Sequence, residues 1–421
     1  SSDLIICSHD FFMEHVWTKE KRKREGQLPL LPDHSCVVFD EGHLLEFAAQ
    51  KALTYKVGEQ TLASVLELLT ANQVREETLY IIEDLIDINE EFFDLLDEKA
   101  IHVSGSNRYE IPMSKEITSF AHKLHKKVEE LEENLVFEAE MYTINDYDLK
   151  VTEEYLEQLG YSLSLFVKDE QAVSWFEENE MTKTLVIMPR LVQDILSEQV
   201  FSKKIPYIFS SATLSDNKSF QYIADSLGIE KYDSFSVESP FDYDEVMKMN
   251  MPAFENGDQL AKLQYTMKTI EENEGRTLVL FQSKEELHWF KENCPMSSYP
   301  FYFEGEAEIS ELVKKFQEDE QSVLFSYHLW EGLDVPGPSL QNVVIHSLPF
   351  PPRDPVFEAK RNSVTDAFEE VDLPYMLLRL RQGIGRLIRT SNDSGTVQIL
   401  IQKDLSEHVK EKIVSILPVT I

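Results

Sequence analysis

The chain has 421 residues with a formal net charge of −36, 42% hydrophobic residues and 11% aromatic residues. This length predicts two or three globular units, and the composition excludes extended disorder. No apolar run approaches the ~18 residues that span a bilayer, the first residues carry no secretory signal pattern, and three scattered cysteines exclude a disulfide framework. We therefore expect a protein of the reducing cytosol with no membrane partner.

The acidic charge argues against a nucleic-acid partner, because proteins bind phosphates through Lys and Arg side chains. Net charge is an average over all surfaces, however, and many acidic residues are concentrated between residues 76 and 98. A protein can keep a local basic channel while the rest of its surface is acidic. The charge therefore weakens the case for DNA binding without excluding it.

The chain opens with alternating strand and helix patterns. Residues 4–7 predict a short buried strand, residues 9–17 an amphipathic helix, and residues 37–39 a second strand. A basic stretch at residues 19–24 lies between that helix and the second strand. It is consistent with a solvated loop and with a contact to a DNA backbone.

From about residue 57 to residue 180 the helical pattern dominates. Apolar residues fall on one helical face and glutamates on the other at Leu124, Val128, Leu131 and Leu135, and a similar stripe runs through residues 81–92. This pattern predicts a helical insertion. A bundle that packs only on itself explains it without any chemistry.

Strand patterns then return, separated by helical segments. An alternation of this kind predicts parallel α/β sheets. The predicted strands lie at residues 185–188, 207–210, 277–281, 322–326, 343–347 and 396–401. We expect an incomplete first α/β domain, the helical insertion, a return to the first domain and a complete second α/β domain, at residues 1–56, 57–180, 181–238 and 239–421.

The sharpest local pattern is Asp40-Glu41-Gly42-His43, which directly follows a predicted strand. Side chains at the carboxyl end of a parallel strand project into the crevice where such sheets bind ligands. Asp40 is suited to holding Mg²⁺ through its water shell, and Glu41 to orienting and deprotonating an attacking water. A solvated acidic pair is the alternative.

Small hydroxyl residues follow another predicted strand, at residues 210–214. They suit a site where two backbones approach closely and hydrogen bonds re-form between two states. The alternative is a helix N-cap formed by Ser215 or Asp216.

Two further segments lie in the second predicted domain. Residues 330–337 contain glycines and a proline that shape a loop, and Asp334 offers a carboxylate to a ribose or to another domain; a plain turn is the alternative. On a predicted helix, Gln382, Arg386 and Arg389 share one face. Two guanidiniums suit the transition state of phosphoryl transfer, and a solvated basic helix end is the competing interpretation.

Together and in this order, the four segments resemble motifs II, III, V and VI of the DinG/XPD (Rad3-like) family of superfamily 2 DNA helicases. Residues 40–43 resemble the DEAH box, 211–214 match the SAT motif, 330–337 resemble the WEGxDxPG loop and 382–389 resemble the QxxGRxxR helix. Further similarities at 239–243, 275–283 and 348–352 extend the resemblance over nearly the whole chain.

The resemblance implies two RecA-like motor domains, the first incomplete, with a helical arch-type insertion. It implies that Asp40 and Glu41 bind Mg²⁺ with ATP and that Glu41 is the catalytic base. The residues that couple nucleotide state to DNA grip would be His43, Ser211, Ala212 and Thr213. Those that reach the nucleotide from the second domain would be Gly332, Asp334, Gln382, Arg386 and Arg389, and those that contact nucleic acid would be Ser283 and Trp330.

The resemblance also implies an ATP-dependent helicase that moves 5′ to 3′ on single-stranded DNA and unwinds forked duplexes in DNA repair or replication. We expect a monomer in the bacterial cytosol. The alternative is a binding module without ATPase activity that holds single-stranded nucleic acid or a protein. The acid of Glu41 and the guanidiniums of Arg386 and Arg389 favour the motor, because a binding module does not need them.

Three departures from the family pattern stand out. Gly42 replaces the usual alanine, a change in size that we expect to be tolerated, and residues 402–404 replace an Asp-x-Arg strand end. No glycine precedes a lysine anywhere, so the GxGKT/S phosphate loop is absent. We expect that loop, and any iron–sulfur cluster, in an upstream region of a longer protein, and little ATP hydrolysis by this chain alone.

Overall fold

The computed structural model describes residues 3–141, 143–168, 171–178, 182–211, 219–237, 239, 242–330, 332, 338–388 and 392–419. The chain forms two compact units. Unit 1 contains residues 1–39, 44–208 and 353–359, and unit 2 contains residues 40–43, 209–352 and 360–421.

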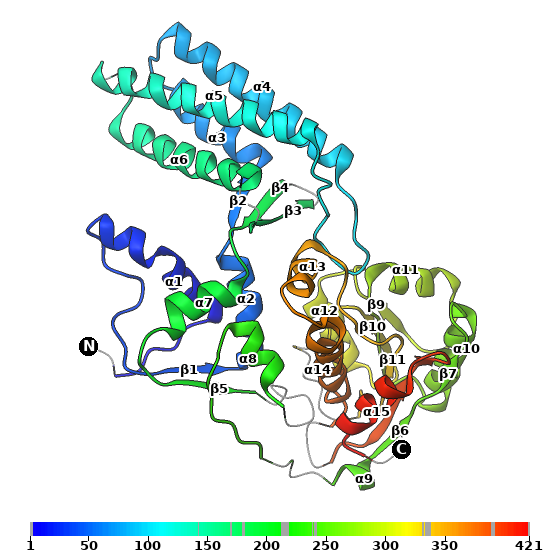
Figure 1. Cartoon of the computed structure of the whole chain (residues 1–421). Helices are drawn as coiled ribbons and strands as arrows, with labels where there is room; N and C mark the ends of the chain where they lie inside the picture. Colours follow the sequence, from blue (N-terminus) through cyan, green and yellow to red (C-terminus); the bar gives the residue numbers. More distant parts are fainter. Residues whose placement is uncertain are drawn as a thin grey trace. The chain divides into compact units, whose positions relative to one another are not determined.

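Unit 1 combines long helices with short strands (Figure 1). Its elements in chain order are α1 (His9–Arg24), α2 (Leu45–Ala52), β2 (Tyr55–Gly58), α3 (Glu59–Thr70), α4 (Glu76–Lys99), α5 (Lys115–Glu140), α6 (Asp146–Lys168), β3 (Val173–Glu178), β4 (Lys183–Met188), α7 (Val192–Leu196) and η2 (Ser197–Phe201). The boundary between the units passes through β1 (Val37–Asp40), η1 (Gly42–Leu44), β5 (Tyr207–Ser210) and α13 (Pro355–Asn362).

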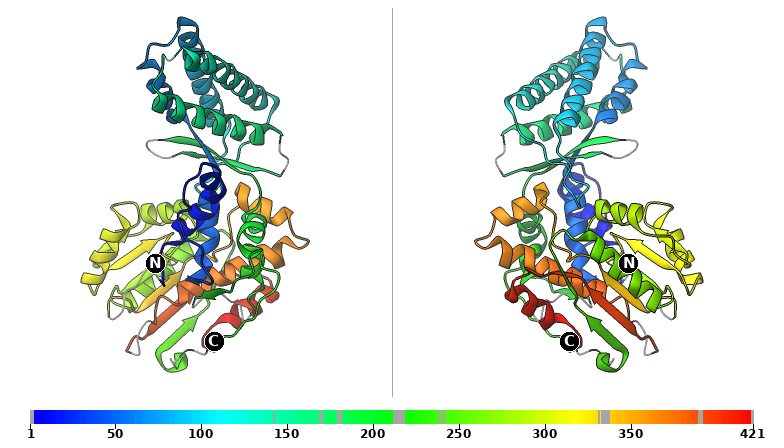
Figure 2. Two further views of the ribbon diagram at one scale, coloured as in Figure 1. Left: turned by 90° about the vertical axis from the view of Figure 1, so that its left-hand side faces the viewer. Right: turned by 90° about the vertical axis from the view of Figure 1, so that its right-hand side faces the viewer.

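The helices α3 to α6 pack into a bundle with one continuous hydrophobic core (Figures 1 and 2). The stripe predicted in α5 is buried at Leu124, Val128, Leu131 and Leu135, and the opposite side of the helix carries exposed glutamates. In α4 the stripe from Ile81 to Phe92 is buried in the same core. The predicted helix faces are therefore confirmed.

A three-stranded antiparallel sheet with the order β2-β4-β3 belongs to the same unit. The prediction that residues 185–188 enter a parallel sheet is wrong, because β4 pairs antiparallel on both of its edges. Phe176, Leu185 and Ile187 from this sheet join the hydrophobic core of the bundle. A short buried run carries no information about strand direction, so the sequence pattern did not distinguish the two arrangements.

Two predictions near the start of the chain are also wrong. Residues 4–7 are not a strand, and Leu4 and Ile6 are exposed, because no strand among the described residues pairs with them. The basic stretch is not a loop but the last two turns of α1. Lys and Arg favour helices, and their charge near the carboxyl end complements the helix dipole.

Unit 2 is built around a parallel sheet (Figure 1). Its elements are α8 (Gln221–Leu227), α9 (Tyr243–Val246), β6 (Met247–Asn250), β7 (Ala253–Phe254), α10 (Gln259–Glu272), β8 (Thr277–Leu280), α11 (Lys284–Asn293), β9 (Phe301–Phe303), α12 (Ile309–Glu318), β10 (Val323–Ser326), β11 (Asn342–Ile345), η3 (Phe368–Asp372), α14 (Leu373–Ile384), β12 (Gly395–Ile399), β13 (Ile401–Gln402) and α15 (Glu407–Ile416).

The sheet has six parallel strands in the order β6-β12-β11-β8-β10-β9. Successive residues of a strand face opposite sides. In β8, Leu278 and Leu280 face a core shared with α12, α14 and α15, whereas Val279 and the following Phe281 face α10 and α11. This helix-covered parallel sheet confirms the α/β class predicted for the second domain.

None of the helices among the described residues is long and apolar enough to cross a membrane.

Candidate functional site

The acidic pair lies at the carboxyl end of β1, which pairs with β5 in a two-stranded sheet. Asp40 is the last residue of the strand and is exposed. Glu41 has a positive φ of 48°, a left-handed conformation that non-glycine residues rarely adopt. The chain therefore turns sharply after Asp40, and both carboxylates stay open to solvent.

Ser211, the first residue after β5, connects the acidic pair to His43. The Ser211 hydroxyl donates to Glu41 Oε2 at 3.0 Å, and His43 Nδ1 lies 2.8 Å from the Ser211 Oγ. Because the hydroxyl hydrogen is directed to Glu41, the Oγ accepts from an Nδ1–H of His43. The ends of two paired strands thus place three predicted site residues within hydrogen-bonding distance of each other.

Gly42 allows this strand end to pack closely. A Cβ added at Gly42 would lie 2.8 Å from the Cδ1 atom of Phe209, closer than real Cβ contacts. The residue is buried, and the 3-10 helix η1 that carries His43 begins at this position. The glycine is therefore tolerated in place of alanine because the neighbouring phenylalanine ring occupies the space of the missing methyl group.

A second group of predicted residues lies around the carboxyl end of α14. Gln382 is buried in the last turn of α14. Gly383 lies against the ring of Trp330, because a Cβ added at this glycine would be 3.0 Å from the ring. Arg386 Nε donates to the carbonyl of Trp330 at 3.0 Å. The guanidinium of Arg379 lies 5.7 Å from the centroid of the same ring. Trp330 therefore packs against this helix and accepts a hydrogen bond from the turn that follows it.

The helix predicted for residues 382–389 ends earlier than expected. α14 stops at Ile384 with Gly385 as its cap, so Arg386 lies in the turn that follows. Two glycines in three residues disfavour further helix. The prediction that Arg386 lies on a helix face is therefore wrong, although the bond from its Nε to the Trp330 carbonyl holds the guanidinium in the turn.

For the remaining predicted residues the structure gives either one local feature or no description. Gly332 has a φ of 77°, which favours glycine. At the departure from the Asp-x-Arg pattern, Lys403 forms an ion pair with Glu255 at 2.6 Å. The predicted residues for which no structure is described are Ala212, Thr213, Asp334 and Arg389.

The two predicted nucleic-acid contacts are buried. Trp330 is 1% exposed, and its indole N–H donates to the carbonyl of Phe281 at 3.1 Å. Ser283 is 8% exposed and caps α11 by accepting from the backbone N–H of Glu286. Their burial does not support direct contact with DNA. Both side chains form hydrogen bonds with the backbone at the carboxyl edge of the sheet.

Sequence reasoning missed Glu286, which organises that edge. Its carboxylate accepts from the backbone N–H of Gln282 at 3.0 Å, from His346 Nδ1 at 3.1 Å and from the Ser347 hydroxyl. Burial by itself raises the pKa of Glu286, but hydrogen bonds from His346, Ser347 and the Gln282 N–H outweigh it and lower the pKa to about 2. The signal was the capping pattern Ser-x-x-Glu at residues 283–286.

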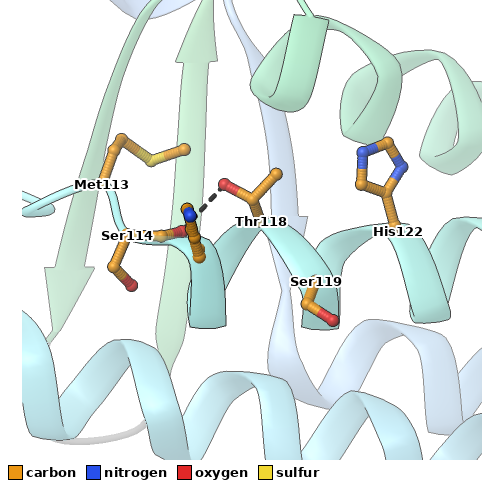
Figure 3. A pocket seen from close by; sticks show the side chains of 6 residues that line it. Met113, Ser114, Thr118, Ser119 and His122 are labelled. Carbon is orange, nitrogen blue, oxygen red and sulfur yellow. Dashed lines mark hydrogen bonds between the residues drawn. The ribbon is translucent and has the colours of Figure 1, made fainter.

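Unit 1 contains a shallow pocket of about 470 Å³ at the start of α5. Figure 3 shows its lining, and the Thr118 hydroxyl there donates to the Ser114 carbonyl at 2.9 Å. None of the lining residues belongs to the four motifs; they are Met113, Ser114, Lys115, Thr118, Ser119 and His122. Among the described residues, no group of three or more His, Cys, Asp or Glu side chains is arranged to hold a metal ion.

Comparisons with known proteins extend over the whole chain. Residues 266–420 match the family described as helicase C-terminal domain. The chain is 58% identical over 422 residues to the probable ATP-dependent helicase YpvA of Bacillus subtilis (strain 168), covering 100% of this chain and 65% of that protein. It is 26% identical over 439 residues to the ATP-dependent DNA helicase YoaA of Haemophilus influenzae, covering 99% of this chain and 67% of that protein.

Solved structures share the fold. A chain described as XPD_APO aligns with a TM-score of 0.55 at 19% identity, covering 95% of this chain and 79% of that chain. A structure of Xpd4 from S. tokodaii aligns with a TM-score of 0.54 at 15% identity, covering 92% of this chain and 76% of that chain. At these identities the likeness shows a shared fold and no more.

Proposed function

We propose, on the premise that this chain belongs to the DinG/XPD-like family of superfamily 2 helicases, that it forms part of an ATP-dependent DNA helicase. The observation that carries the proposal is the hydrogen-bonded group of Glu41, Ser211 and His43 at the ends of two paired strands. An acid that takes part in water activation and is also bonded to a neighbouring strand end can link hydrolysis to movement of that strand end.

In this proposal Asp40 holds the Mg²⁺ of bound ATP through water, and Glu41 acts as the general base. Mg²⁺ keeps several waters and takes only one or two carboxylates, which fits the exposed carboxylate of Asp40. When bound there, the ion would supply positive charge that offsets charge developing on the phosphates. The side chain of Glu41 is 55% exposed, so an attacking water can reach its carboxylate.

His43 and Ser211 would couple the nucleotide state to the grip on DNA. A change in the charge or position of Glu41 during hydrolysis alters the bond that its carboxylate accepts from the Ser211 hydroxyl. His43 then has to re-form its own bond to that hydroxyl. Ala212 and Thr213 would continue this coupling along the chain.

The second set of nucleotide contacts would come from Gly332, Asp334, Gln382, Arg386 and Arg389. Support comes from Arg386, whose Nε is held by the carbonyl of Trp330 at 3.0 Å. A guanidinium that is already positioned loses little freedom when it binds a phosphate, and such arginines contribute about 10³ to 10⁵ in rate in other phosphoryl-transfer enzymes.

The finer proposal is a cytosolic monomer that moves 5′ to 3′ on single-stranded DNA and unwinds forked duplexes in repair or replication. The chain spans 65% of the length of the YpvA relative. Its sequence contains no GxGKT/S phosphate loop, which supplies the backbone N–H groups and lysine that hold the phosphates. We therefore assign ATP hydrolysis to the full-length protein and little hydrolysis to this chain by itself.

The test is the substitution Glu41→Gln in the full-length protein, with DNA-stimulated ATP turnover and nucleotide affinity both measured. Loss of the base should lower turnover by about 10²- to 10⁴-fold while nucleotide affinity is retained. Glu255→Gln is the matched control, because Glu255 is an exposed glutamate that pairs with Lys403 outside the site.

Unchanged turnover in Glu41→Gln would remove Glu41 from the role of base. Turnover that is absent even in the wild-type full-length protein, together with retained DNA binding, would favour the binding module over the motor. Strong DNA-stimulated turnover by the 421-residue chain alone would contradict the need for a phosphate loop.

A further inference from the structure

Two aromatic residues, Tyr327 and His328, follow directly after β10 at the carboxyl edge of the parallel sheet. Ligands of such sheets bind at this edge. The two ring centroids are 4.2 Å apart with the planes tilted by 42°. Tyr327 packs against the core between the sheet and α11, whereas the His328 side chain is 69% exposed. The edge therefore presents an aromatic step whose inner ring is anchored and whose outer ring is open to solvent.

Glu304, the first residue after β9, holds this step in one conformation. Its side chain is 9% exposed and accepts from the backbone N–H groups of Tyr327 at 2.9 Å and His328 at 3.2 Å. The same carboxylate bonds the His328 ring at Nδ1, 2.5 Å away, and the Ser326 hydroxyl. A largely shielded side chain thus accepts four hydrogen bonds from the turn that carries the exposed ring.

Glu304 remains a carboxylate in this setting. Burial by itself raises the pKa of Glu304, but hydrogen bonds from His328, Ser326 and the Tyr327 N–H outweigh it and lower the pKa. An exposed histidine ordinarily samples several rotamers and loses that freedom when it binds a ligand. Here the ring is already ordered, so a ligand that stacks on it incurs less of this loss.

The carboxylates around Tyr327 and His328 determine which part of a nucleic-acid strand can bind beside these rings. Besides burial, the carboxylates of Glu304 and Glu285 act on the Tyr327 hydroxyl and raise its pKa. Carboxylates repel phosphate, so a phosphate group is disfavoured beside these rings. The flat face of a base is uncharged and stacks on aromatic side chains, which suits an acidic protein that binds a nucleic-acid strand.

We propose that Tyr327 and His328 form a stacking site for a base of single-stranded DNA. This inference rests on the proposed helicase function and adds to it the part of the DNA that this edge of unit 2 recognises. Glu304 is a positioning residue of the site, since it bonds the backbone N–H groups of both residues and the His328 ring and does not itself touch the base.

The test compares two strands of equal length and equal phosphate number, one with all bases and one made of abasic nucleotides. Binding of each to the full-length protein is followed by fluorescence anisotropy. His328→Ala and Tyr327→Leu should each weaken binding of the strand with bases by about ten-fold, because one stacking contact is lost. Binding of the abasic strand should not change, and Tyr327→Phe should bind both strands as the wild type does.

His288→Ala is the matched control. His288 lies on α11, its side chain is 68% exposed, and it pairs with Glu292 at 3.1 Å, so its loss should leave both affinities unchanged. Circular dichroism and thermal unfolding verify that each variant is folded. His328→Ala is expected to fold because the His328 side chain is 69% exposed.

Two results would overturn the stacking site while leaving the helicase proposal intact. One is wild-type affinity of both His328→Ala and Tyr327→Leu for the strand with bases. The other is an equal loss on both strands, which would point to a phosphate contact. If the wild-type protein binds neither strand, the DNA-helicase proposal itself fails, and the stacking site fails with it.

Discussion

Glutamates that are fully or largely shielded from solvent have different roles in the helical bundle of unit 1 and in the parallel sheet of unit 2. In the bundle, the fully buried Glu138 accepts from the backbone N–H and Nε of Arg75, at 3.1 and 3.0 Å, and from the Thr78 and Thr143 hydroxyls. These bonds fasten the start of α4 to the end of α5. In the sheet, Glu286 and Glu304 hold loops at the edge where parallel strands end.

The difference shows that a buried carboxylate is not by itself a sign of function. All three glutamates accept several hydrogen bonds, and in all three those bonds outweigh the effect of burial and lower the pKa. What differs is the group that is held. Glu138 holds helix ends, whereas Glu304 holds the turn that carries the exposed His328 ring, which a ligand can reach.

The largest effect on stability is expected for Glu138→Ala, which tests the structural half of this comparison. The change leaves the guanidinium of Arg75 and the Thr78 hydroxyl without their shared partner, and should lower the free energy of unfolding of unit 1 by about 3 to 5 kcal/mol. Urea unfolding measures the loss. ATP turnover of the folded full-length protein should not change.

Glu140→Ala is the control for that measurement, because Glu140 is an exposed residue of the same helix. A loss in Glu138→Ala no greater than in this control would show that the buried network contributes little. A large loss of turnover below the unfolding transition would instead place Glu138 in the functional half of the comparison.

An intermediate effect on stability is expected for Glu286→Gln, and its size depends on pH. The folded-state pKa is lowered from 4.5 to about 2, so the stabilisation is fully present above about pH 4.5 and is lost as the pH falls toward 2. As the pH falls across this interval, the free energy of unfolding of the wild type should decrease by roughly 2 to 3 kcal/mol more than that of Glu286→Gln. Urea titrations at several pH values between these limits give the difference.

Glu292→Gln, an exposed change on the same helix, should follow the wild type over that interval. Parallel curves for the wild type and Glu286→Gln would contradict the lowered pKa of Glu286.

The smallest effect is expected for Lys127→Met in the bundle. Lys127 pairs with Asp84 at 3.3 Å and Glu130 at 2.8 Å, but the side chains of these partners are 64% and 45% exposed. Exposed ion pairs contribute about 0 to 1 kcal/mol, and salt screens them. Thermal unfolding at low and high salt should show a small difference that disappears at high salt; a larger, salt-independent loss would mean that the lysine stem packs in the core.

The parts of the fold that the sequence predicted depend on local periodicity. The buried faces of α4 and α5 repeat every three to four residues, and the strands of unit 2 are short apolar runs between helices, so both patterns are visible in the chain. The errors arose where pairing decides the outcome. Residues 4–7 need a partner strand, and β4 found antiparallel partners that no local pattern specifies.

The site residues also fall into those that a local motif predicted and those whose role depends on strand pairing. Asp40, Glu41, His43 and Ser211 were predicted from motif resemblance, and the structure brings the last three together. Glu304 was missed because it is one acid among many, and its importance arises only when β9 and β10 pair and place it beside Tyr327. The early end of α14 was missed because the motif was read as a continuous helix through two glycines.

The contact between Gly42 and Phe209 constrains the order in which substitutions can accumulate in this lineage. With the phenylalanine in place, a methyl group at position 42 would lie 2.8 Å from the ring, so alanine there is disfavoured. A smaller residue at 209 removes the obstacle and leaves a space that alanine can fill. The two positions, far apart in the chain, are therefore sterically coupled: descendants that acquire alanine at position 42 are expected to have changed position 209 first.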